Sequence, residues 1–104
     1  MSLYQAVLFS AAFHLMTPHT FDFYRVGVKC AETKTEVVVS IEYQDVPLIS
    51  ILTSSHNTLN LVGSGVSQLT LAPVDFPIKM TIHNRQETLS FFISNQCKKS
   101  PLPK

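Results

Sequence analysis

Two cysteines carry the most informative chemistry in this chain. Cys30 and Cys97 each stand alone, without the CxxC spacing or nearby histidines of a zinc site, and two ligands cannot complete such a site. Two alternatives remain. A disulfide between them favours an oxidising compartment, whereas two free thiols favour a reducing one. We expect the disulfide, because the low charge and the strand-rich sequence between the cysteines are typical of an exported β-domain.

The other reactive side chains do not form a recognisable catalytic set. The four histidines are scattered along the chain: His14, His19, His56 and His83. HExxH, GxSxG and Walker sequences are absent. Ser54, Ser55 and His56 could supply a hydroxyl and a base, but such neighbours are typical of a turn. We therefore expect no catalytic residue, no metal site and no cofactor, and we do not expect an enzyme.

Polar turns are the places where we expect contacts with a partner. Loops at the ends of a β-domain tolerate polar residues and commonly carry its binding function. One such segment runs from 54 to 58, a second contains Gly63-Ser64-Gly65, and a third runs from 84 to 87. The individual binding candidates are Ser54, Ser55, His56, Asn57, Asn84 and Arg85.

These turns must be positioned by strands, because the apolar residues repeat with a period of two. The clearest case is Glu36 to Tyr43, in which Val37, Val39 and Ile41 face one way. Similar runs predict strands over 21–30, 36–43, 48–52, 59–62, 69–71, 78–82 and 89–93. Gln44 to Pro47 should break the pattern, and Gly63 to Gly65 should interrupt it with a tight turn or a bulge.

About seven short strands at regular spacing predict an all-β fold, an antiparallel β-sandwich of immunoglobulin-like character. The chain has no Trp, which counts against the antibody type of that fold. We divide it into an apolar N-terminal segment (1–20), a β-sandwich domain (21–98) and a basic, proline-containing tail (99–104).

The N-terminal segment has no charged residue before Asp22. A helix over 2–16 would be ~22 Å long, shorter than the ~30 Å hydrocarbon core, so we expect no membrane span. Three alternatives stay open: a secretory signal peptide, a helix packed on the sheet, or a helix that docks into a partner.

The composition limits the partners. Of 104 residues 45% are hydrophobic and only 14% are charged, and the net charge of +1 provides no field for nucleic acid. We expect a non-enzymatic, secreted or extracellular recognition or adhesion domain that binds a protein partner, with neither nucleic acid nor a small-molecule cofactor. The alternative is an intracellular structural subunit anchored in an assembly by its N-terminal helix. Both interpretations allow a homo-oligomer.

Overall fold

One long hairpin organises the fold. The computed structural model describes residues 19–23 and 25–101, which form seven antiparallel strands and one short 3₁₀ helix. The elements are β1 (His19–Phe23), β2 (Val26–Glu32), β3 (Val37–Leu52), β4 (Thr58–Leu71), η1 (Pro73–Asp75), β5 (Ile78–His83), β6 (Thr88–Ile93) and β7 (Lys99–Pro101). This confirms the prediction of an antiparallel all-β fold of about seven strands.

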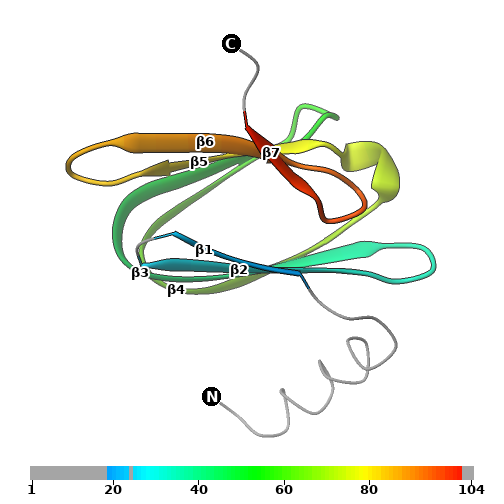
Figure 1. Ribbon diagram of the computed structural model, residues 1–104, viewed down its shortest axis with the longest axis horizontal. Helices are drawn as coiled ribbons and strands as arrows, with labels where there is room; N and C mark the ends of the chain where they lie inside the picture. Colours follow the sequence, from blue (N-terminus) through cyan, green and yellow to red (C-terminus); the bar gives the residue numbers. More distant parts are fainter. Residues whose placement is uncertain (1–18, 24, 102–104) are drawn as a thin grey trace, which may run out of the picture.

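Strand β3 has 16 residues and belongs to both layers of the fold. Its first half pairs with β2 and its second half with β5, along the same edge, while β4 follows nearly all of the other edge. Val39, for example, lies between Cys30 and Leu69. The sheet therefore curls: β1 and β2 form one layer, β5 to β7 form the other, and β3 and β4 bend through both (Figure 1).

The core fills the space between the two layers. In β5 alternate residues are buried, as expected of a strand with one face on the core, and most of the other strands contribute inward-facing residues as well. The largest fully buried side chains are Phe91, Ile41, Ile49, Ile51, Ile78, Met80, Ile93, Val28, Val39, Cys30 and Cys97. Cys30 of β2 and Cys97, in the turn between β6 and β7, form a disulfide with Cα atoms 5.6 Å apart. The bridge therefore joins one layer to the other.

The interruption expected at Gln44 to Pro47 does not end the strand. The β3–β4 register shifts between Tyr43 and Val46, and again between Val46 and Ile49. Such bulges leave residues unpaired while the strand continues, so Pro47 is accommodated without a ladder hydrogen bond. The segments 36–43 and 48–52, predicted as two strands, thus form one bent strand.

The same correction applies to β4, because Gly63 to Gly65 bend the strand and do not end it. Gly63 has φ 87°, in the left-handed region that favours glycine. A Cβ on Gly65 would lie 3.0 Å from Oη of Tyr43, so the absence of a side chain makes room for that ring. The expected strands 59–62 and 69–71 therefore join.

Both ends of the chain also differ from expectation. The single strand expected over 21–30 is a hairpin, in which Phe23 of β1 faces Val26 of β2. Lys99–Pro101, within the expected tail, forms β7 beside β6. Residues 1–18 of the N-terminal segment lie outside the described residues, so the three alternatives for that segment stay predictions. The last two residues of the segment, His19 and Thr20, begin β1.

Gly63→Ala is expected to lower the free energy of unfolding by about 1–2 kcal/mol, the cost of a left-handed conformation for a residue with Cβ. No atom lies within 4 Å of the added methyl group, so the backbone alone sets this cost. Denaturant unfolding measures it. Gly27→Ala is the matched control, since Gly27 lies in a strand without a positive φ, and it should be neutral or slightly stabilising. Equal losses in both variants would contradict this explanation.

Candidate functional site

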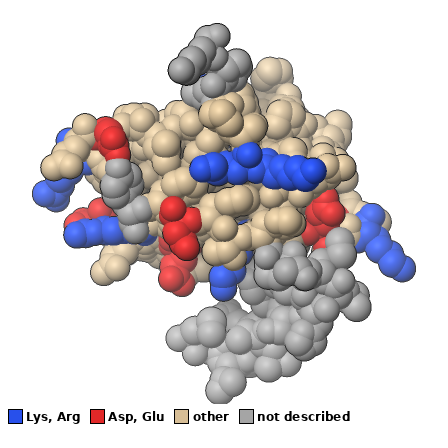
Figure 2. Space-filling model, in the orientation of Figure 1, with Lys and Arg blue, Asp and Glu red and all other residues tan. Residues whose placement is uncertain are grey.

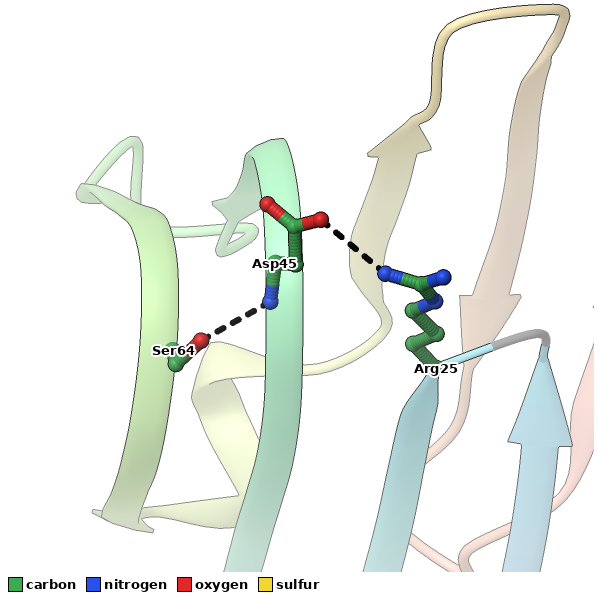
Figure 3. Close-up of polar contacts among 3 residues, drawn as sticks. All are labelled: Arg25, Asp45 and Ser64. Atoms are coloured by element: carbon green, nitrogen blue, oxygen red, sulfur yellow. Dashed lines mark hydrogen bonds and ion pairs between the residues drawn. The ribbon is translucent and has the colours of Figure 1, made fainter.

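Three polar residues hold the corner where β3 and β4 pass from one layer to the other (Figure 3). Asp45 has φ 51°, and its backbone N–H donates to Oγ of Ser64 over 2.8 Å. Its Oδ2 accepts a hydrogen bond from Nη1 of Arg25 over 3.0 Å. Both side chains of this ion pair are more than 60% exposed, so it contributes no more than about 1 kcal/mol. Its role is to position Arg25 beside the corner.

A pocket of about 300 Å³ opens at this corner, and we call it the corner pocket. Its lining comes from the β1–β2 hairpin, the bulged part of β3 and the β5–β6 turn: Arg25, Val26, Asp45, Val46, Pro47, Ile82, Asn84, Arg85 and Gln86. The side chains of Val26, Val46 and Ile82 are buried and give it an apolar floor. Exposed polar side chains form its rim.

The rim is ordered by the turn between β5 and β6. Oδ1 of Asn84 accepts the backbone N–H groups of Gln86 and Glu87, each over 2.8 Å, and the N–H of Asn84 donates to the carbonyl of Glu87. An Asn side chain that bonds the backbone two or three residues on is a common turn former. This Asx turn fixes the backbone at Arg85, whose exposed side chain lines the pocket.

The corner pocket combines charged side chains with an apolar surface. Two guanidinium groups, from Arg25 and Arg85, lie beside the apolar floor, and the Asp45 carboxylate pairs with Arg25, so Arg85 is the cation without this partner. Such a surface suits an apolar side chain flanked by a carboxylate, because guanidinium groups bind carboxylates through paired hydrogen bonds. Within residues 19–23 and 25–101, no group of three or more His, Cys, Asp and Glu is arranged to hold a metal ion.

The candidate loop at residues 54–58 lies away from the corner pocket. Leu52 pairs with Lys79 and Leu48 with His83, so the 54–57 turn and the 84–87 turn leave opposite ends of the β3–β5 ladder. The structure therefore does not bring the two sets of candidates together. Asn84 and Arg85 line the corner pocket, whereas Ser54, Ser55, His56 and Asn57 lie near η1.

Two of those candidates hydrogen-bond to the segment in and after η1. Oγ of Ser54 donates to the carbonyl of Pro77 over 2.8 Å, and Oγ of Ser55 donates to Oδ1 of Asp75. These bonds tie the β3–β4 turn to the segment around η1. His56 and Asn57 remain exposed at the tip of this turn.

Sequence reasoning missed Arg25, Asp45 and the apolar floor of the pocket. Asp45 precedes Pro47 between two apolar runs, which indicates a break but not an ion pair. Arg25 lies 20 positions before Asp45, and no local pattern connects them.

The surface elsewhere is weakly charged. In the view of Figure 2, Lys, Arg, Asp and Glu side chains are scattered, and most of the visible surface carries neither sign. In the part of the chain that the structure describes, no helix is long and apolar enough to cross a membrane. No family model, curated protein or solved structure matches this chain.

Proposed function

We propose that this chain is a non-enzymatic extracellular recognition domain that binds a protein partner through the corner pocket. The observation that carries the proposal is the apolar floor beside two guanidinium groups: that of Arg25 on the β1–β2 hairpin, and that of Arg85 on a turn that Asn84 holds in place. Buried anchors in apolar pockets, with arginine nearby, supply much of the affinity of protein interfaces. A turn ordered before binding also reduces the entropy lost on association.

Two further properties support an extracellular setting. The disulfide between Cys30 and Cys97 suits an oxidising compartment. The charged fraction of 14% is well below the ~25% of an average soluble domain. We therefore include export of the protein from the cell in the proposal.

The experiment compares the two ends of the sandwich. A photo-crosslinking residue replaces Gln86 in one sample and His56 in another, both exposed in turns. Each protein is incubated with intact cells of its own source and then illuminated. We expect a discrete crosslinked protein from position 86, because Gln86 lines the corner pocket and His56 does not. Crosslinks from position 56 alone would contradict the proposal.

Arg85→Ala, in the protein that carries the crosslinker at position 86, should reduce the crosslinked product roughly tenfold or more, the effect of removing an interface anchor. Lys34→Ala is the matched control, because it removes one exposed positive charge from the β2–β3 turn. Quantified bands at equal protein concentration measure the effect. Equal yields from the two variants would show that Arg85 does not contact the partner.

A further inference from the structure

Among residues 19–23 and 25–101, no strand pairs with the edge of β4 that faces away from β3. Among the described residues β4 pairs with β3 alone, although it is 14 residues long. Edge strands invite pairing with another strand unless they are short or carry charge or proline. The other two edge strands follow that rule: β1 has five residues and contains Asp22, and β7 has three and contains Lys99 and Pro101. Strand β4 has neither charge nor proline.

The sequence of β4 reads almost the same in both directions about Ser64. Four pairs of positions are identical: Thr58 and Thr70, Leu59 and Leu69, Val62 and Val66, Gly63 and Gly65. A fifth pair, Asn60 and Gln68, consists of two amides. Only Leu61 and Ser67 differ in character. In an antiparallel pair of two such strands centred on Ser64, each residue faces the mirrored position of the other strand, so that like residues lie opposite one another.

A second copy of the chain is therefore the natural partner for this edge. With a two-fold axis at Ser64, each β4 residue lies opposite its palindromic counterpart in the other copy, as an isologous interface requires. That axis is perpendicular to the sheet, so the core-facing side of one copy continues into the core-facing side of the other. The bend at Gly63 to Gly65 then meets the same bend, because it lies at the centre of the palindrome.

The exposed side chains suit this arrangement. Val62 and Val66 are 67% and 68% exposed, which places them among the most exposed large hydrophobic side chains of the described residues. In the symmetric register Val62 of each copy faces Val66 of the other, so the dimer covers four of them, and such β-branched pairs stabilise a sheet. No charge between Thr58 and Leu71 would repel its counterpart.

We propose that two copies of this chain pair antiparallel through β4 and form a continuous sheet across a two-fold axis at Ser64. The proposal is independent of the corner pocket, which is bordered by other elements. A pocket mutation that abolishes partner binding would therefore leave the dimer intact.

Sedimentation equilibrium of the full chain over a range of concentrations tests the proposal. The wild-type protein should sediment as a dimer, and Val62→Lys should raise the dissociation constant about tenfold, because both symmetric Val–Val pairs are lost. Val74→Lys is the matched control, since Val74 is 77% exposed in η1 and away from the edge. A monomeric wild type at every concentration would overturn the proposal.

A cysteine trap tests the register, and it does not depend on the stability of the lysine variant. Val62→Cys and Val66→Cys proteins, mixed and oxidised, should form a crosslinked heterodimer, because these positions face each other at Cα distances of about 5 Å. Val62→Cys alone should not crosslink to itself, since two such positions would lie ~13 Å apart along the strands. Equal crosslinking in both samples, or none in either, would contradict pairing centred on Ser64.

Discussion

Replacing both Cys30 and Cys97 with alanine is expected to lower the free energy of unfolding by about 4 kcal/mol. The two sulfurs close a long loop, with a sequence separation of 67, and they join β2 in one layer to the β6–β7 turn in the other. Without the bridge the unfolded chain gains the entropy that the loop had removed. Chemical denaturation followed by far-ultraviolet circular dichroism measures the loss, and no Trp is available as a fluorescent probe.

Both cysteines are almost fully buried, so the alanine variant also removes core volume. The wild-type protein unfolded with and without reductant is the control, because it keeps both sulfur atoms. Reduction alone should produce most of the loss. A reduced protein within about 1 kcal/mol of the oxidised one would show that the loop closure does not stabilise the fold.

The second large effect is expected at Phe91, where replacement by alanine should lower the free energy of unfolding by about 3–5 kcal/mol. Phe91 of β6 is 2% exposed, and its ring centroid lies 4.7 Å from that of Phe23 in β1. This stack joins the two outer parts of the curled sheet. The Lys99 ammonium lies 5.6 Å from the Phe91 ring centroid, within the range of a cation–π contact. The same denaturation assay measures the loss.

The neighbouring residue provides the control for this prediction. Phe92 has the same side chain but follows Phe91 in β6, so it points to the outer face and is only half-buried. Phe92→Ala should lower the free energy of unfolding by no more than about 1 kcal/mol. If the two variants were equally destabilised, the assignment of inner and outer faces in β6 would be wrong.

Much of the fold could be predicted from periodicity alone. Val37 to Tyr43 alternate in the sequence, and Val39 and Ile41 are fully buried in the structure. The bends were missed because they depend on both strands of a hairpin. Asp45 and Gly63 each adopt a positive φ, and only the pairing of β3 with β4, in which Gly63 lies opposite Val46, turns an apparent break into a bulge.

The sequence predicted the part of the candidate site that lies within one turn, but not the contacts between residues far apart in the chain. Asn84 and Arg85 belong to one turn, and their residue types indicated it. Arg25 and Asp45 come together through the pairing of β2 with β3, which a single sequence does not specify. Ser54 and Ser55 were correctly assigned to a turn, but their hydrogen bonds to Pro77 and Asp75 depend on how η1 packs.

Intact mass of the protein from its own cells, alkylated without reduction, tests most directly whether this is a disulfide-bridged, exported domain. We predict that the chain takes up no alkyl group, because Cys30 and Cys97 are bonded to each other. Uptake of an alkyl group at each of the two cysteines would contradict the bridge. It would place the protein in a reducing compartment and favour the intracellular structural subunit over the extracellular recognition domain.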